Sequence, residues 1–171
     1  ERERRKLEIL YRASGIQNRY SVLEDYGKIA INDYSFYPQT NDLEPFPSVG
    51  KRMRIYEQKA VSLCAAAIEN ALPKNYDVSK ITHFITVSCT GMYAPGIDIE
   101  LIQQLGLPTS IQRTAINFMG CYAAFNAIKT ANQIVKATPN AQVLVVAVEL
   151  CSIHFQKTKD ADTLLANAID N

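Results

Sequence analysis

The spacing of apolar residues predicts an alternation of helices and strands over most of the chain. Apolar positions recur at intervals of three and four in five segments, which predicts helices at 2–13, 55–72, 97–105, 121–137 and 160–169. Shorter apolar runs predict strands at 81–87, 111–118 and 143–148, the last a central strand covered on both faces. From residue 81 onward strands and helices alternate, so we expect a layered α/β domain with right-handed crossovers.

The predicted helix at 121–137 has apolar residues on more than one side. One face holds Cys121, Ala124, Phe125, Ile128 and Val135, and another holds Ala123, Ala127, Ala131 and Ile134. The polar residues leave only a narrow stripe, so we expect this helix to be largely buried.

Residues 16–50 show no clear periodicity and contain three prolines. We expect a long irregular surface segment here, with a short strand at 19–22. A loop of this length is uncommon unless it covers something or binds a partner.

Composition excludes several classes of function. The 171 residues are 47% hydrophobic and 20% charged, which is typical of a globular protein with a core. A formal net charge of +1 gives no reason to expect nucleic acid or an anionic membrane as a partner. Nothing approaches the roughly 20 apolar residues needed to cross a bilayer.

The four cysteines include no Cys-x-x-Cys pair, and with only two histidines no metal-binding pattern is present. We therefore expect reduced thiols in a cytoplasmic protein. Cys64 lies on the apolar face of a predicted helix and is expected in the core, and His83 lies inside a predicted strand and is expected to be structural.

The strongest chemical signal is the turn between the strand at 111–118 and the helix that follows it. Gly120 allows a sharp turn, and Cys121 then lies in the first helical turn, where unpaired N–H groups stabilise a thiolate. This pattern leaves two alternatives equally open, a nucleophilic cysteine or a small core residue. Cys89 and Cys151 also follow predicted strands, which predicts one shared pocket at the carboxyl edge of the sheet.

Two further polar residues lie beside that predicted pocket. His154 could be a base for Cys121, but we favour a pocket-lining histidine. Glu149 ends an apolar strand and is either a hydrogen-bond anchor, which we favour, or a pocket carboxyl group with a raised pKa.

The motifs around these residues resemble the type III polyketide synthases, the chalcone synthase-like family. The resemblance rests on GCYAA at 120–124, AQVLVV at 141–146 and ELCSIHF at 149–155. It extends to SKITH at 79–83, to Thr90-Gly91 and Pro95-Gly96, and to YRASGI at 11–16 with Arg19-Tyr20.

The resemblance implies a fold and a reaction. Residues 1–171 would form a partial N-terminal thiolase-like domain, a layered αβα half of the αβαβα thiolase fold, in a homodimer. An acyl-CoA starter would form a thioester on Cys121 and condense with malonyl-CoA by decarboxylative Claisen chemistry. No cofactor and no metal is implied beyond coenzyme A thioesters as substrates.

The resemblance also implies roles for the residues of this chain that match the family's motifs by position. Cys121 matches the nucleophile, Lys6 matches one residue of the basic cluster that binds the phosphates of coenzyme A, and Ile9 departs from that cluster. The positions that line or support the cavity are Cys89, Thr90, Glu149, Cys151 and His154.

The family's second half is expected to be absent. Its catalytic histidine and asparagine have no counterpart here, and its Phe-Gly-Asp-Gly run is replaced by Ile169-Asp170-Asn171. We therefore expect this polypeptide to be inactive in condensation by itself. Alternatives are a β-ketoacyl-ACP synthase III-like enzyme and a non-catalytic truncated dimerisation domain.

Overall fold

The structure is a computed structural model that describes the backbone of residues 2–170 and the side chains of residues 5–169. The chain forms two compact units. Residues 53–149 form the first, here called the sheet unit, and residues 1–52 with 150–171 form the second, here called the terminal unit.

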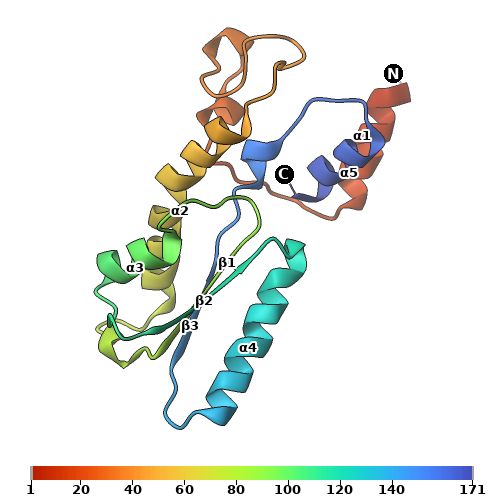
Figure 1. Cartoon of the computed structure of the whole chain (residues 1–171). Coiled ribbons are helices and arrows are strands. Elements are labelled where there is room, and N and C mark those ends of the chain that lie inside the picture. Colours follow the sequence, from red (N-terminus) through yellow and green to blue (C-terminus); the bar gives the residue numbers. More distant parts are fainter. Residues whose placement is uncertain (1, 171) are drawn as a thin grey trace. The chain divides into compact units, whose positions relative to one another are not determined.

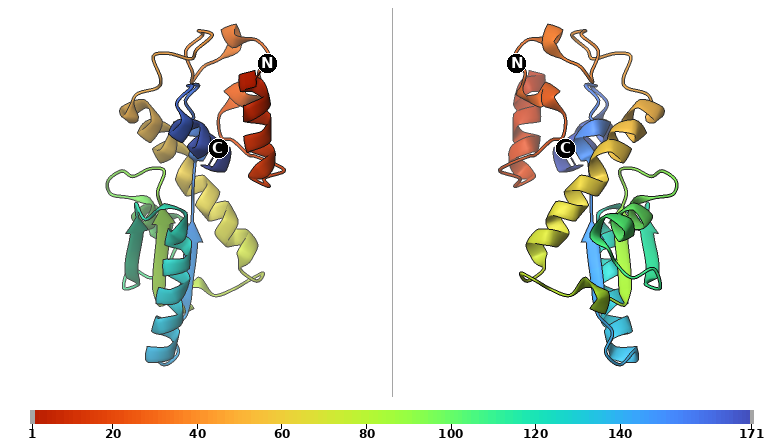
Figure 2. Two further views of the ribbon diagram at one scale, coloured as in Figure 1. Left: turned by 90° about the vertical axis from the view of Figure 1, so that its right-hand side faces the viewer. Right: turned by 90° about the vertical axis from the view of Figure 1, so that its left-hand side faces the viewer.

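A three-stranded parallel sheet forms the centre of the sheet unit (Figures 1 and 2). The strands are β1 (His83–Ser88), β2 (Gln112–Asn117) and β3 (Val143–Ala147), in the order β2-β1-β3. His83 lies opposite both Gln112 and Val143, and all six residues of β1 are buried. The predicted strands are therefore confirmed, and a short 3-10 helix, η3 (Val78–Lys80), precedes β1.

The prediction that the run at 143–148 is the central strand is wrong. Among the described residues β3 pairs only with β1, and Val146 is the one buried residue within the strand. An apolar run indicates covered faces and does not reveal which edges are paired, so the sequence could not distinguish β3 from β1.

Helices cover both faces of the sheet, which confirms a layered α/β/α architecture (Figure 1). On one face, Ile85 and Val87 of β1 pack against α4 (Ala123–Ala137). On the other face lie α3 (Ile97–Leu105) and the part of α2 (Val49–Ala71) that belongs to this unit. The Tyr56 hydroxyl of α2 donates a hydrogen bond to Ser88 Oγ over 2.7 Å.

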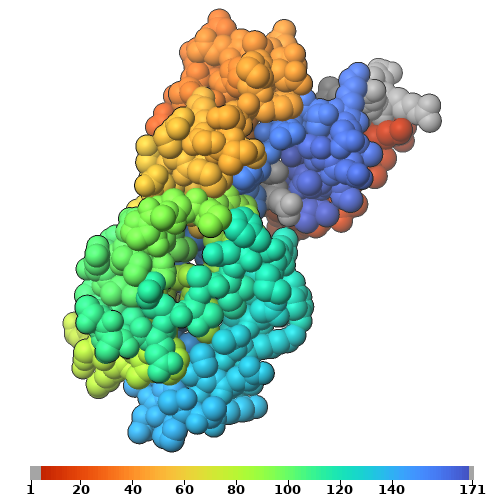
Figure 3. Space-filling model, in the orientation of Figure 1, coloured from red at the N-terminus to blue at the C-terminus, as the bar shows by residue number. Residues whose placement is uncertain are grey.

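The expectation that α4 is largely buried is wrong for this chain. Ala123 and Ala127 are buried against the sheet, but Phe125, Ile128 and Val135 are 60%, 61% and 54% exposed. The helix, cyan in Figure 3, forms a large part of the surface of its unit. The sheet covers only one side of a helix that is apolar on two.

The terminal unit joins the two ends of the described chain. Its helices α1 (Arg2–Ala13) and α5 (Ala161–Asp170) pack against each other. They confirm the helices predicted at 2–13 and 160–169. The short 3-10 helices η1 (Glu24–Gly27), η2 (Ile31–Asp33) and η5 (Cys151–His154) complete it. None of the helices that the structure describes has both the length and the apolar character that a membrane crossing requires.

The predicted strand at 19–22 is wrong, because its residues bond to side chains and helix ends instead of to a neighbouring strand. Arg19 donates to the Ala168 carbonyl over 2.8 Å, and Ser21 Oγ lies 2.7 Å from Ser152 Oγ. The rest of the segment 16–48 is irregular apart from η1 and η2, as expected, whereas residues 49 and 50 already belong to α2.

Candidate active site

The turn after β2 positions the candidate nucleophile. Phe118 and Gly120 have φ values of 58° and 63°, in the left-handed region. Glycine adopts that conformation freely, whereas Phe118 is strained there by roughly 1 kcal/mol. The chain reverses at this corner and enters the 3-10 helix η4 (Gly120–Tyr122), which continues directly into α4. The predicted turn at Gly120 is confirmed.

Cys121 is exposed at the start of this helical run. The alternative that it is a buried core residue therefore does not hold in this chain. Cys64, in contrast, is 1% exposed, and burial raises the pKa of its thiol to about 12. A thiol with that pKa is almost fully protonated at neutral pH and is a poor nucleophile. Of the two, only Cys121 has a suitable environment, and its nucleophilic role stays a prediction.

Cys89 reaches the same corner from the neighbouring strand. It follows β1, and its Sγ donates a hydrogen bond of 3.3 Å to the carbonyl oxygen of Gly120. The Phe118 N–H also donates to the Ser88 carbonyl over 3.3 Å, so the ends of β1 and β2 are tied together. Cys89 and Cys121 thus lie at the same edge of the sheet, and the pocket predicted to be shared by them stays a prediction.

Glu149 ties the end of β3 to the same edge. Its Oε1 accepts the Cys89 N–H over 2.8 Å, and its Oε2 accepts the Thr90 N–H over 2.9 Å and the Thr90 hydroxyl over 2.6 Å. A longer contact of 3.1 Å joins Oε2 to the Cys89 nitrogen. These are the contacts of a hydrogen-bond anchor, the role favoured from the sequence. The substrate-binding roles of all three residues stay predictions.

Cys151 and His154 lie in the terminal unit, on η5. Arg52 Nη1 lies 2.7 Å from His154 Nδ1. A guanidinium group has only donors, so Nδ1 must accept and the neutral ring carries its proton on Nε2. This tautomer presents a donor at Nε2, which agrees with a lining histidine better than with a general base. The shared pocket of Cys151 and Cys121 stays a prediction.

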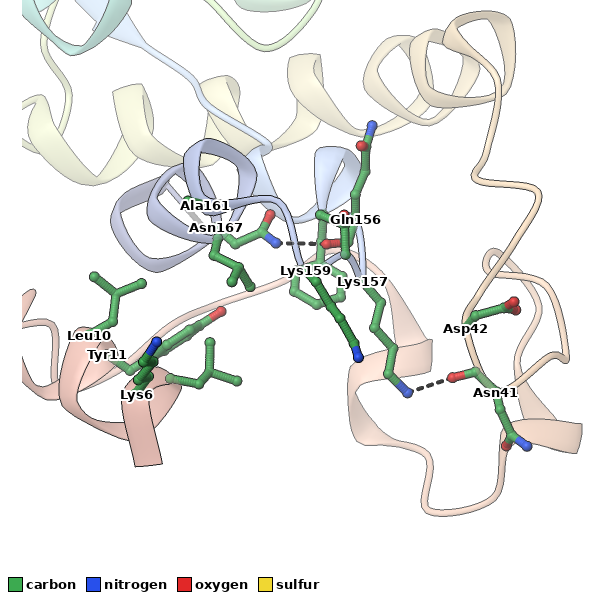
Figure 4. A pocket seen from close by; sticks show the side chains of 14 residues that line it. Lys6, Leu10, Tyr11, Asn41, Asp42, Gln156, Lys157, Lys159, Ala161 and Asn167 are labelled. Carbon is green, nitrogen blue, oxygen red and sulfur yellow. Dashed lines mark hydrogen bonds between the residues drawn. The ribbon is translucent and has the colours of Figure 1, made fainter. Parts of the chain in front are cut away.

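Lys6 lies on α1 in the wall of a cavity of about 700 Å³ within the terminal unit (Figure 4). Lys157 and Lys159 also line it, and among the side chains that the structure describes Asp42 is the one acidic residue in its wall. Lys157 donates to the Asn41 carbonyl over 2.5 Å. Leu7, Leu10, Phe155 and Leu164 make part of its wall apolar. The coenzyme A contact of Lys6 stays a prediction.

Two groups escaped the sequence reasoning. One is the Gly120 carbonyl, which the Cys89 thiol contacts across 31 positions of sequence. The other is Arg52, which contacts His154 across 102 positions. Neither has a local sequence signal. Among the side chains that the structure describes, no group of three or more acidic, histidine or cysteine residues could hold a metal ion.

Comparison with known proteins identifies the family. The family described as chalcone and stilbene synthases, N-terminal domain, matches residues 1–169. An α-pyrone-synthesis polyketide synthase-like protein of Mycobacterium tuberculosis is 35% identical over 71% of this chain and 31% of its own length. The 1,3,6,8-tetrahydroxynaphthalene synthase of Streptomyces coelicolor is 34% identical over 72% of this chain and 33% of its own length.

Solved structures show the same relationship. The C-terminal type III polyketide synthase domain of the Dictyostelium protein Steely1 superposes with a TM-score of 0.78 at 31% identity, over 96% of this chain and 43% of that one. The Streptomyces coelicolor synthase gives 0.76 at 30% identity, over 95% and 43%. The chain thus spans less than half the length of each of these relatives. It belongs to the type III polyketide synthase family and corresponds to the N-terminal half of its thiolase-like fold.

Proposed function

We propose that this chain supplies the nucleophile half of a polyketide synthase active site, with Cys121 as the residue that holds the growing chain. The observation that supports this most directly is the exposure of Cys121 in the first turn of a helix at the carboxyl edge of a parallel sheet. Membership of the type III polyketide synthase family then favours acyl transfer over other thiol chemistry.

In the proposed reaction the Cys121 thiolate attacks the carbonyl carbon of an acyl-CoA. A bond from Sγ to the acyl carbon forms, and coenzyme A leaves as a thiolate that takes up a proton. Malonyl-CoA then loses CO₂, and the resulting carbanion attacks the Cys121 thioester. A carbon–carbon bond forms, the Cys121 thiolate is released, and the product is a β-ketoacyl-CoA.

The residues of this chain would serve the first step. Cys121 lies in the first turn of the helical run formed by η4 and α4, where the positive end of the helix dipole would stabilise negative charge on its sulfur. Cys89, Thr90, Glu149, Cys151 and His154 would line or support the cavity. The histidine and asparagine that the resemblance assigns to oxyanion stabilisation and decarboxylation have no counterpart in residues 1–171, so we propose that this polypeptide does not condense substrates by itself.

Binding of coenzyme A would involve Lys6. Lys157 and Lys159 line the same cavity, and among the described side chains Asp42 is the one carboxylate beside them, which supports a phosphate contact there. A homodimer and the absence of any cofactor other than the thioester substrates belong to the same proposal. So does a cytoplasmic location, which the four free cysteines support.

The test is acyl transfer to the chain itself. The protein is incubated with acetyl-CoA, digested, and its cysteine peptides are weighed by mass spectrometry. We expect an acetyl group on Cys121, and none after Cys121→Ala. A chain whose Cys121 reacts with iodoacetamide yet takes no acetyl group from acetyl-CoA would refute the proposed acyl transfer.

A second measurement tests the proposed incompetence in condensation. With acetyl-CoA and malonyl-CoA together, we expect no sustained release of CO₂ or of polyketide. Steady multiple-turnover formation of product by this chain would show that the missing histidine and asparagine are dispensable.

A further inference from the structure

We propose that Glu149 and Cys89 are positioning residues for Cys121, acting as a relay of hydrogen bonds across the three strand ends. The inference rests on the proposed function, since it concerns the reactivity of the thiol that the function requires. It assigns to Glu149 a role in the orientation of the nucleophile that is separate from any contact with substrate.

The first part of the relay fixes the residues that follow β1. The Glu149 carboxylate accepts two consecutive N–H groups, from Cys89 and Thr90, and the Thr90 hydroxyl. A carboxylate, which has only acceptors on both oxygens, suits all three donors. An amide in its place would turn a donor toward one of these N–H groups. The position of the Cys89 backbone therefore depends on the two acceptor oxygens of Glu149.

The second part connects Cys89 to the nucleophile. The Cys89 thiol donates to the Gly120 carbonyl over 3.3 Å, and the Ala123 N–H donates to the same oxygen. This carbonyl belongs to the peptide group whose N–H is that of Cys121. Two donors on the oxygen polarise the peptide group and hold the left-handed Gly120 in place. Both effects would fix the backbone at Cys121 and at the start of the helical run that carries its thiol.

The relay and a simple charge effect predict opposite changes in the alkylation rate of Cys121 when Glu149 is replaced. If Glu149 acted only as a nearby negative charge, its removal would favour the Cys121 thiolate and speed its alkylation. If Glu149 acts by positioning, its removal loosens the corner and slows alkylation. The sign of the change in Glu149→Gln therefore separates the two explanations.

The experiment measures the rate of iodoacetamide alkylation of Cys121 between pH 5 and pH 9 in the 171-residue chain, residue by residue by mass spectrometry. We expect Glu149→Gln and Cys89→Ala each to slow alkylation at pH 7 about threefold, the effect of a rise of about half a unit in the thiol pKa. Cys89→Ser keeps a donor and should lie closer to the unsubstituted chain. Glu69→Gln, an exposed carboxyl group on α2, is the matched control.

A double variant tests whether the two residues act along one path. Glu149→Gln combined with Cys89→Ala should slow alkylation no more than the stronger single variant, because either change already breaks the relay. Circular dichroism and the thermal midpoint check that each variant is folded. Additive effects of the two substitutions, or faster alkylation in Glu149→Gln, would overturn the proposal.

Failure of the relay can be told apart from failure of the proposed function. If Cys121 in the unsubstituted chain reacts no faster at pH 7 than N-acetylcysteine, the activated nucleophile itself is refuted. If Cys121 is activated but the variants at Glu149 and Cys89 match the unsubstituted chain, only the relay is refuted.

Discussion

Replacement of Asp25 by asparagine should destabilise the terminal unit and loosen η5. Asp25 is 2% exposed, and its carboxylate accepts four hydrogen bonds from the segment 35–37. The donors are the N–H groups of Ser35, Phe36 and Tyr37, over 2.9, 3.0 and 2.7 Å, and the Ser35 hydroxyl, over 3.0 Å. The Tyr37 hydroxyl in turn donates to the Ser152 carbonyl of η5 over 2.6 Å.

The size of the destabilisation follows from the number of acceptor oxygens that the side chain at position 25 keeps. Asparagine has one carbonyl oxygen, which can keep the two N–H groups now on Oδ2. Its amide N–H₂ would then face the partly buried Ser35 N–H, so that two donors oppose each other. That penalty, and the loss of charge from the remaining bonds, should lower the free energy of unfolding by about 2–4 kcal/mol.

Urea unfolding followed by circular dichroism would measure this change, with Asp33→Asn, an exposed carboxyl group on η2, as the control. Burial acts to raise the pKa of Asp25, but the hydrogen bonds from Ser35, Tyr37 and Phe36 outweigh it and leave the pKa below its ordinary value.

The contribution of Asp25 to the stability of the fold is therefore present above its unfolded pKa of about 3.9 and is lost as the pH falls through the lower pKa of the folded state. The difference between Asp25→Asn and the unsubstituted chain should accordingly shrink below about pH 4. A difference that is absent at pH 7, or that persists unchanged at pH 2, would refute the reasoning.

Three further outcomes follow from packing and exposure. Gly91→Ala should lower the free energy of unfolding by about 1–3 kcal/mol, measured in urea, because the new methyl group would overlap the buried ring of Tyr56. Cys64 should resist iodoacetamide at pH 8 and react only in denaturant, since burial raises the pKa of its thiol to about 12. Asp98→Asn should change the free energy of unfolding by less than about 1 kcal/mol, because the ion pair of Asp98 with Arg113 is partly exposed. Urea unfolding at low and at high salt would measure this change.

Much of the fold was predictable because its signals are local. The helix predicted at 97–105 has the bounds of α3, and Gly106, a left-handed C-cap with φ of 64°, is the local signal that ends it. The prediction starts the preceding helix at residue 55, whereas α2 begins six residues earlier, at Val49. Ser48, whose hydroxyl accepts the Lys51 N–H over 3.3 Å, was an N-cap signal that the sequence did contain.

The candidate site was predictable only in part. Parallel strands bring their carboxyl ends to one edge, so the nearness of Cys89 and Cys121 followed from topology. The hydrogen bonds of Glu149 reach Cys89 and Thr90, which lie 60 and 59 positions away in the sequence, and their geometry depends on how the strands twist and end. Such contacts leave no periodic pattern in the sequence. The sequence therefore leaves two roles open for Glu149, a hydrogen-bond anchor and a pocket carboxyl group.

The corner around Cys121 combines strain with apolar exposure, and neither stabilises this chain. Phe118 is held in the left-handed region, and Phe118, Met119 and Tyr122 are 63%, 53% and 52% exposed. A corner selected for stability alone would place a small polar residue at the strained position and keep aromatic rings out of water. Strained backbone persists where the surrounding structure fixes it, and here the hydrogen bonds from Cys89 and Phe118 do so. The packing of this chain therefore does not explain the local sequence, which agrees with the proposed role of this corner in orienting the Cys121 thiol.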